Sequence, residues 1–212
     1  ADTGLDATGA SAAPSSATPA VSRDILKARY GTFASKTLKG TGTKVIKLPK
    51  GATRGLVTVS ARGKGTITVQ VLKKNRKKQG RAVVAKQALP YAGTAVYGLE
   101  LGQYDPTYLK VSSTSAKRWT VKVQPLHRAK AMKKKQKGSG DAVFRVTVTK
   151  PKKWSISYRS DVKKNFSVTT YGLIRSQVLV DKATAKYSGK VRVEDFSGFV
   201  VVRSQGRWTL KR

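Results

Sequence analysis

Hydrophobic and polar residues alternate along most of the chain from residue 43 onward, which is the pattern of half-buried β-strands. In the run 66–71, for example, Ile67, Val69 and Val71 share one face. In the first half of the chain, the pattern predicts strands at 44–48, 56–60, 66–71, 81–84, 94–101, 108–112 and 119–123. In the second half, it predicts strands at 142–149, 154–158, 165–171, 176–180, 190–194, 199–203 and 208–211. Many short strands separated by turn residues are typical of β-sandwiches and barrels.

Three segments break this alternation. Residues 1–22 are mainly Ala, Ser, Thr, Gly and Pro, which predicts a flexible, disordered tail. Residues 23–35 have a composition compatible with one or two helical turns. The run 125–137, PLHRAKAMKKKQK, has no strand period and predicts a basic linker, in which 128–135 is also compatible with a short helix.

The two halves of the chain resemble each other in the same order of motifs. Gly40–Thr43 matches Gly138–Asp141, and the turn Tyr91–Gly93 matches Tyr187–Gly189. Further matches are Val57, Ile67 and Val69 with Ile156, Phe166 and Val168, and Arg118–Lys122 with Arg207–Lys211. This order predicts an internal duplication. We therefore expect an all-β chain of two tandem small antiparallel β-sandwiches, Ig-like or jelly-roll-like, at 36–125 and 136–212, with the linker at 126–135.

The repeated aromatic residues have a structural interpretation. Trp119 and Trp208 fall on the last strand of each half and are expected to anchor the cores. Tyr91 and Tyr187 each precede a small residue and a glycine, which predicts a turn entering the next strand. The alternative is that these rings stack on a sugar.

These motifs also support a resemblance to a known group of proteins. The residues that carry it are Gly40, Gly42, Val45, Leu48, Tyr91, Gly93, Thr94, Trp119, Thr120, Gly138, Gly140, Asp141, Tyr187, Gly189, Trp208 and Thr209. Their order resembles the uncharacterised secreted tandem β-sandwich modules of actinobacteria, with a Gly-x-Gly, Tyr-x-Gly, Trp-Thr-x-Lys pattern. Thr43 and Lys190 depart from that pattern. The resemblance implies an exported sandwich and no particular activity.

The net charge of the chain indicates a class of binding partner. The 212 residues include 44 Lys and Arg against 10 Asp and Glu, giving a net charge of +34. Solubility alone needs a net charge of only about 2–8 on a small domain, so this excess favours binding to polyanions. The chain has no cysteine, which excludes disulfides, thiolate zinc sites and cysteine nucleophiles.

Several basic runs are candidate contacts for a polyanion. One run with Arg81 lies between two predicted strands, one lies on the linker, and two fall in turns of the second repeat. The candidates are Lys73, Lys74, Arg76, Lys77, Lys78, Arg81, Lys133, Lys134, Lys135, Lys137, Lys150, Lys152, Lys153, Lys163 and Lys164. Lys and Arg also alternate with apolar residues on strands, as at Lys44, Lys47, Arg203 and Lys211, so one sheet face is a further basic candidate.

Little in the sequence indicates catalysis or a cofactor. Adjacent Glu194 and Asp195 would point to opposite faces of a strand and do not form a catalytic pair. Gly40-x-Gly42 precedes a strand, unlike a phosphate-binding loop. His127 and Met132 are residue types that ligate haem iron, although a linker histidine without a ligand is the preferred explanation of His127. We expect no enzyme, no metal site and no cofactor.

The sequence therefore predicts a secreted or cell-surface-associated, non-enzymatic protein that binds polyanions through its basic loops. Glycosaminoglycan, cell-wall polymer and extracellular DNA all remain candidates, and no motif for base-specific readout is visible. The alternative is a secreted haem- or porphyrin-binding or antioxidant protein. A third reading, a protein that coats anionic membranes, lacks the amphipathic helix that it would need. No apolar run approaches the roughly 20 residues of a membrane span.

Overall fold

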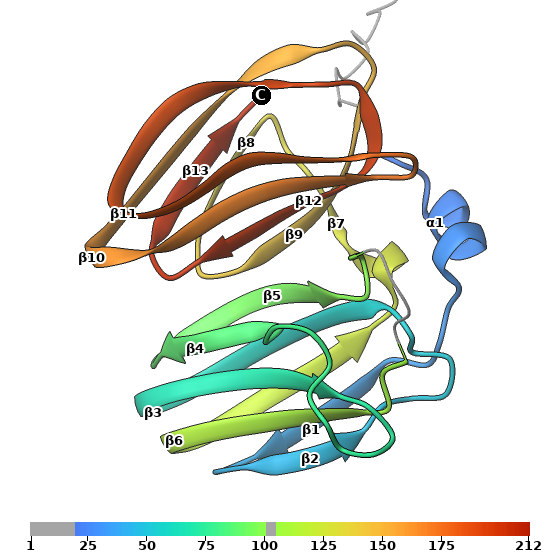
Figure 1. Ribbon diagram of the computed structural model, residues 1–212, viewed down its shortest axis with the longest axis vertical. Helices are drawn as coiled ribbons and strands as arrows, with labels where there is room; N and C mark the ends of the chain where they lie inside the picture. Colours follow the sequence, from blue (N-terminus) through green and yellow to red (C-terminus); the bar gives the residue numbers. More distant parts are fainter. Residues whose placement is uncertain (1–19, 101–104) are drawn as a thin grey trace, which may run out of the picture.

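The computed structural model contains two curled β-sheets that lie one above the other, with one short α-helix beside them (Figure 1). The structure describes residues 20–100 and 105–212. The predicted tail at 1–22 lies almost wholly outside this range. The all-β architecture with two sheet domains confirms the fold class expected from the sequence.

The first domain is one sheet whose two longest strands are bent. Its strands are β1 (Lys36–Gly40), β2 (Lys44–Lys47), β3 (Gly55–Leu72), β4 (Val84–Ala88), β5 (Tyr91–Tyr97) and β6 (Tyr108–Gln124). β3 and β6 pair along their length, with register shifts between Arg62 and Thr66. A Cβ on Gly65 would lie 2.1 Å from the Thr114 carbonyl oxygen, so only glycine fits this bend. Each long strand therefore contributes one half to each layer of the sandwich.

The second domain repeats this plan. Its strands are β7 (Lys130–Ala131), β8 (Lys135–Ser139), β9 (Ala142–Val148), β10 (Lys152–Gly172), β11 (Ser176–Val193), β12 (Phe196–Ser204) and β13 (Arg207–Lys211). β10 and β11 are the long bent pair, with a register shift between Arg159 and Lys164. One layer has the strand order β8–β13–β10–β11, and the other layer is built from β7, β9, β12 and the remaining halves of β10 and β11.

The predicted strands correspond to observed ones with four kinds of difference: merged strands, shifted bounds, missed strands and one strand that is wrong. Neighbouring predictions merge, so that 56–60 and 66–71 are both parts of β3, because the backbone bends without leaving the ladder. The prediction at 94–101 corresponds to β5, and residue 101 lies outside the described residues. The strands β1 and β8 were missed because their sequences, KTLKG and KQKGS, contain little that is apolar. The strand predicted at 81–84 is wrong, since β4 begins at Val84.

The same glycine–tryptophan contact occurs in both domains. Gly40 on β1 pairs with Trp119, and Gly138 on β8 pairs with Trp208. A Cβ on either glycine would approach the indole to 2.6 or 2.5 Å, so the ring fills the space that the missing side chain leaves. Each indole Nε1 donates to the carbonyl oxygen two residues beyond its glycine, at 2.9 and 2.8 Å. Both tryptophans are buried, as predicted for core anchors.

The sheet register corrects two details of the repeat. Val59 pairs with Val121, two residues after Trp119, and Ile156 pairs with Leu210, two residues after Trp208. Val59, and not Val57, is therefore the counterpart of Ile156. Tyr91 is the first residue of β5, as a turn-entering residue should be. Tyr187 instead lies within β11, because that strand continues through the position where the first domain has a turn.

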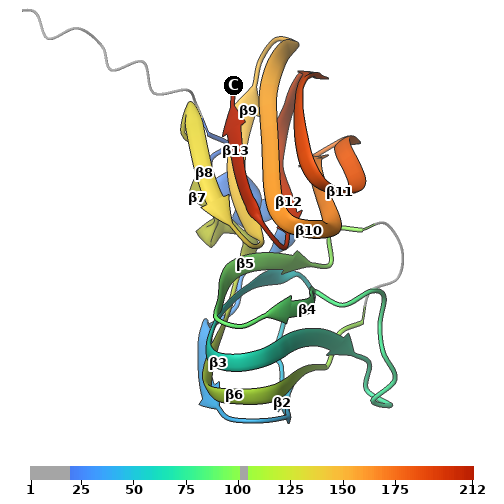
Figure 2. The same ribbon diagram turned by 90° about the vertical axis from the view of Figure 1, so that its left-hand side faces the viewer.

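The two domains share a third hydrophobic cluster. It includes Leu26 from α1 (Arg23–Tyr30), Leu126 from the 3₁₀ turn η1 (Leu126–Arg128) and Phe199 from β12, all essentially inaccessible to water. Figure 2 shows β5 of the first domain lying against the second. The segment 126–135, expected as a linker, contributes η1, β7 and the first residue of β8, and several of its side chains are buried. Apolar packing therefore fixes the two domains against each other.

Candidate functional site

The basic run 73–78 forms a tight exposed loop between β3 and β4. The Lys73 amide donates to the Lys77 carbonyl oxygen at 2.9 Å, and the Asn75 side chain accepts from the Lys77 amide. The Arg76 guanidinium lies 4.6 Å from the centre of the Tyr108 ring. The prediction that this run lies between two strands is confirmed, and the loop stands apart from the basic segments of the second domain.

Two other runs, far apart in sequence, are brought together in the second domain. The amide of Arg212 donates to the Lys134 carbonyl oxygen at 3.0 Å, which places the end of the chain beside the run 133–137. Burial lowers the pKa of Lys152, and the positive charges of Arg212 and Lys134 lower it further. Lys134 and Lys152, one from each run, therefore lie close to Arg212.

The remaining candidates lie elsewhere. Lys163 and Lys164 lie at the bend of β10. Arg81 is paired with Glu100 at 2.8 Å, and both side chains are exposed. Arg203, which the alternation placed on a basic face, is half-buried and donates to the Ala82 carbonyl oxygen across the domain junction. Arg81 and Arg203 are therefore engaged within the protein.

A large group of cationic side chains lies on a sheet surface that the basic runs only partly cover. We call it the basic face: the outward side of β8, β13, the first half of β10 and the second half of β11. Its residues are Lys135, Lys137, Ser139, Lys153, Ser155, Ser157, Arg159, Lys186, Ser188, Lys190, Arg192, Arg207, Thr209 and Lys211. Every one of these positions is Lys, Arg, Ser or Thr, and their side of the layer is exposed apart from the half-buried Thr209.

The register arranges these side chains in rows across the strands. In one row, Arg159 on β10 lies directly between Arg207 on β13 and Lys186 on β11. Neighbouring strands are about 4.8 Å apart, and like charges directly opposite each other on a sheet are destabilising. Within the described residues, none of the three side chains has an acidic partner. The fold thus tolerates three adjacent cations that no acidic side chain of residues 20–100 or 105–212 neutralises.

The next row carries hydroxyl groups. Thr209 lies between Lys137 and Ser157, and Ser157 faces Ser188. The basic face is hollowed over these two rows, forming an open depression of about 780 Å³ lined by both of them. Cations and hydroxyl groups therefore share one shallow concavity.

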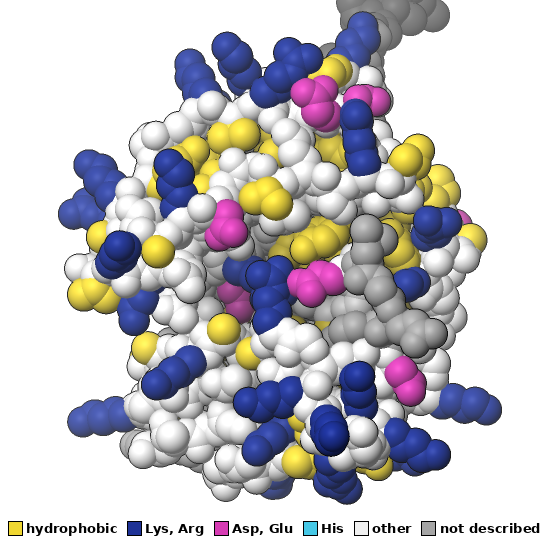
Figure 3. Space-filling view, in the orientation of Figure 1, with side chains coloured by type: hydrophobic (Ala, Val, Ile, Leu, Met, Phe, Trp, Pro, Cys, Tyr) yellow, Lys and Arg dark blue, Asp and Glu magenta, His cyan; other side chains and the backbone are white. Residues whose placement is uncertain are grey.

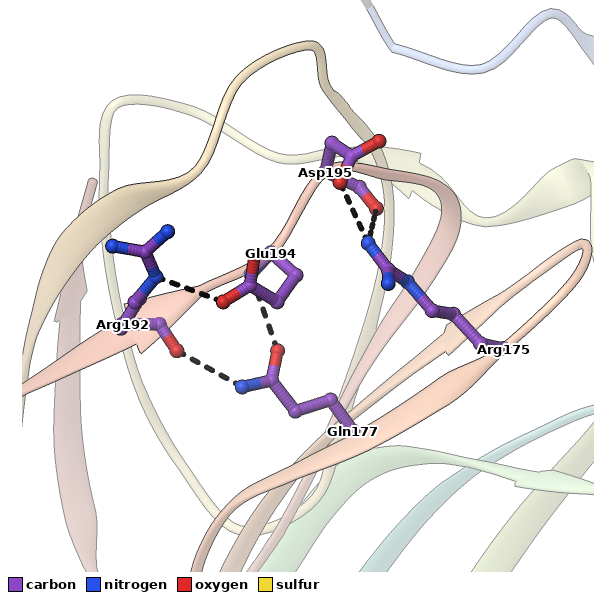
Figure 4. A network of polar contacts seen from close by, with 5 residues as sticks. All are labelled: Arg175, Gln177, Arg192, Glu194 and Asp195. Carbon is purple, nitrogen blue, oxygen red and sulfur yellow. Dashed lines mark hydrogen bonds and ion pairs between the residues drawn. The ribbon is translucent and has the colours of Figure 1, made fainter.

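Acidic side chains lie at the margin of the basic face. Arg192 Nε donates to Glu194 at 2.8 Å, while Arg175 pairs with Asp195 at 2.6 Å (Figure 4). Gln177 joins the backbones of Arg192 and Glu194 through its amide. Figure 3 shows Lys and Arg side chains projecting from both domains, with few Asp and Glu among them. Among the residues that the structure describes, Arg192 is thus the one cation of the basic face that forms an ion pair.

The first domain carries a sparser version of the same surface. Arg62 and Arg118 face each other, as Arg159 and Arg207 do in the second domain. Further equivalents on its outward side are Lys39, Ser60, Thr120 and Lys122. Ala92 and Pro90 stand where the second domain has Ser188 and Lys186, so the cationic row is shorter there.

The sequence indicated a basic sheet face through Lys211, but it did not assign Arg159, Lys186 or Arg207 to that face, because these residues lie outside the predicted strands. The signal is present at period two, as in Lys186-x-Ser188-x-Lys190-x-Arg192 and Arg207-x-Thr209-x-Lys211. Each cation is separated from the next by a core-facing residue, so no run appears. Seeing that these strands are neighbours requires the register.

A buried carboxyl group joins the two domains. Asp141 accepts hydrogen bonds from the Tyr91 hydroxyl at 3.0 Å and the Ser204 amide at 2.9 Å. Its own carbonyl oxygen accepts from the Thr94 amide at 2.9 Å. Loss of hydration on burial raises the pKa of Asp141 to about 6, and burial together with Asp141 raises the pKa of Tyr91. These hydrogen bonds hold the two domains together at their junction. The Gly-x-Gly-Asp motif of the second domain and the Tyr-x-Gly motif of the first are therefore in contact and have a structural role.

The residues considered as haem ligands lie inside the protein. Burial lowers the pKa of His127, as do Lys27 and Arg128, and its side chain is 4% exposed. Met132 packs in the core of the second domain. A haem at either residue would require this packing to open. Among residues 20–100 and 105–212, no cluster of His, Cys, Asp and Glu is suited to a metal ion.

The repeated aromatic residues that were considered for sugar stacking are buried or half-buried. Trp119, Trp208 and Tyr91 are buried, and Tyr187 is half-buried against the core. Within the part of the chain that the structure describes, no helix is both long and apolar enough to cross a membrane.

Comparisons with known proteins identify no family. No family model and no curated protein matches the chain. Similar solved structures include a conserved protein of unknown function from Pseudomonas aeruginosa PAO1, 12% identical, with a TM-score of 0.23 over 83% of this chain and 76% of that one. Another is a turret protein of the Sulfolobus turreted icosahedral virus, 12% identical, with a TM-score of 0.23 over 84% and 97%. At such TM-scores these likenesses carry no argument about function.

Proposed function

We propose that this protein is a secreted, non-enzymatic binding protein for polyanions and that the basic face is its principal contact surface. The observation that carries the proposal is the row Arg207, Arg159 and Lys186, three adjacent cations without an acidic partner among the described residues. A protein that needed only solubility could disperse these charges. An external polyanion would remove their mutual repulsion on binding.

The physical basis of binding would be counterion release. A polyanion holds a layer of condensed cations, and each anionic group that Lys or Arg neutralises sets one of them free. The basic face offers several such groups on a rigid sheet, so little conformational entropy is lost when it binds. The loop 73–78 presents its cations on a single turn, whereas the basic face presents cations on four neighbouring strands. A polyanion can contact more cations at once on the basic face, which favours this surface over the loop as the main site.

Export is part of the proposal. Its support is the Ala-, Ser-, Thr- and Pro-rich composition of residues 1–22, which suits a tether outside the cell, and the resemblance to exported modules. Outside the cell, the accessible polyanions include glycosaminoglycans, cell-wall polymers and extracellular DNA.

Two variants of equal charge test this proposal. The first changes Lys137, Arg159, Lys186 and Arg207 on the basic face to Thr, and the second changes Lys73, Lys74, Lys77 and Lys78 in the loop to Ser. Binding to a heparin fragment is measured by titration calorimetry at fixed salt. We expect the face variant to lose at least about tenfold in affinity, equivalent to about 1.4 kcal/mol, and the loop variant less than about threefold.

Equal losses would mean that net charge alone matters and would contradict a specific surface. A larger loss in the loop variant would assign the site to the loop. Circular dichroism of both variants shows whether the strands are retained.

A further inference from the structure

We propose that the basic face selects a linear sulfated polysaccharide, whose sulfate groups contact the cationic row and whose sugar hydroxyls contact the row of Thr209, Ser157 and Ser188. This inference rests on the proposed function and names the class of polyanion. The two rows are neighbours in the depression on the basic face. Successive outward residues of a strand are about 7 Å apart, and neighbouring strands are about 4.8 Å apart.

The hydroxyl row is the first argument. Ser157 and Ser188 are exposed, and within the described residues none of the three side-chain hydroxyls has a hydrogen-bond partner in the protein. A hydroxyl group both donates and accepts, and sulfated sugars present both hydroxyl and sulfate groups. The phosphodiester backbone of DNA offers acceptors but no donors along its edge. The alternation of a cationic row with a hydroxyl row therefore matches the sugar polymer better.

The position of the aromatic rings is the second argument. Proteins that bind single-stranded nucleic acid without sequence preference use exposed aromatic rings as stacking platforms. In this layer, Trp154, Tyr158 and Trp208 all point into the core and are at most 4% exposed. The outward positions of the same strands carry no aromatic residue. Tyr187, which also lines the depression, is half-buried against the core, so bases would find little aromatic surface for stacking on the basic face.

The shape of the surface is the third argument. Base readout in duplex DNA requires an element that enters a groove, such as a helix or a two-stranded ribbon. The depression is open and concave, and it lies in the middle of a four-stranded layer. A concave surface accepts an extended chain along it, whereas a duplex would touch only its rim.

The experiment compares two polymers on the full-length protein. A heparin-derived oligosaccharide and DNA oligomers, single-stranded and duplex, are matched in number of negative charges and titrated at one salt concentration. The test variant combines Ser157→Ala, Ser188→Ala and Thr209→Val, which removes three hydroxyl groups without changing the charge. The matched control combines Ser35→Ala, Thr43→Val and Ser176→Ala, which lie off the basic face and make no side-chain hydrogen bond within the described residues.

We expect the test variant to bind the oligosaccharide about tenfold or more weakly, since each hydrogen bond contributes about 0.5–1.5 kcal/mol. Its affinity for DNA should stay within twofold of the wild-type value, and the control should match wild type for both polymers. Tighter binding of DNA than of the oligosaccharide, or no effect of the three substitutions on oligosaccharide binding, would overturn this inference. The proposed function would then still be tested separately, by the face variant. Binding of neither polymer would overturn both.

Discussion

At the scale of single residues, Asp141 shows how one buried side chain connects the two domains. The sequence marks it as part of a Gly-x-Gly-Asp turn, and the structure shows it bridging two domains through Tyr91 and Ser204. The burial of the two tryptophans could be predicted from the sequence, because a large ring on an alternating strand faces the core. The role of Asp141 could not, because Tyr91 and Ser204 lie 50 and 63 residues away along the chain and only the fold brings them together.

The raised pKa of Asp141 predicts an unusual pH dependence of stability. The native protein holds this proton up to about pH 6, whereas a free aspartate releases it near pH 3.8. The stabilisation is therefore full below pH 3.8 and is lost as the pH rises through about 6, by about 3 kcal/mol in total. Asp141→Asn should remove this loss. In denaturant unfolding, the free energy of unfolding of the variant should therefore rise relative to that of wild type between pH 4 and 7. Asp195→Asn, at an exposed ion pair, is the control, and parallel pH curves for wild type and Asp141→Asn would contradict the assignment.

At the scale of elements, the basic face follows from strand register. Alternation predicted the outward residues of the expected strands 154–158, 190–194 and 208–211, but not which strands lie side by side. Lys186 and Ser188 fell at an expected turn, whereas β11 continues through them. The long bends were also invisible, because a bulge at Gly65 leaves the hydrophobic pattern on either side intact. The hydrogen-bonded ladder alone sets Arg207, Arg159 and Lys186 in one row.

Repulsion within the cationic row is expected to lower the stability of the folded protein, although the same row provides the binding surface. Arg159→Thr removes the central charge and supplies a good strand former, so its thermal unfolding temperature should exceed that of wild type at low salt. The gain should shrink at high salt, because the screening length falls from about 30 Å at 0.01 M to 3 Å at 1 M. Arg192→Thr is the matched control, since it removes a cation that has Glu194 as partner and should not stabilise. A lower unfolding temperature for Arg159→Thr at low salt would show that the row is not under repulsion.

At the scale of the whole molecule, cationic side chains lie at equivalent strand positions in both domains. The second copy has the complete cationic and hydroxyl rows, and the first keeps only Arg62, Arg118 and their neighbours. Composition predicted a polyanion partner, and the repeat predicted two domains. The shared cluster around Leu26, Leu126 and Phe199 was not predicted, because an apolar residue between strands gives no sign of what covers it. The domains consequently present their surfaces in a fixed relation.

The salt dependence of polyanion binding tests the central claim most directly. The affinity of wild type, the face variant and the loop variant for one heparin fragment is measured from low to high salt. On nucleic acids, the slope of log affinity against log salt is about 0.7–0.9 per contacted phosphate, and sulfate contacts should behave similarly. We predict a steep slope for wild type, a clearly shallower one for the face variant and an unchanged one for the loop variant. Affinity that ignores salt, or identical slopes for wild type and the face variant, would contradict the account.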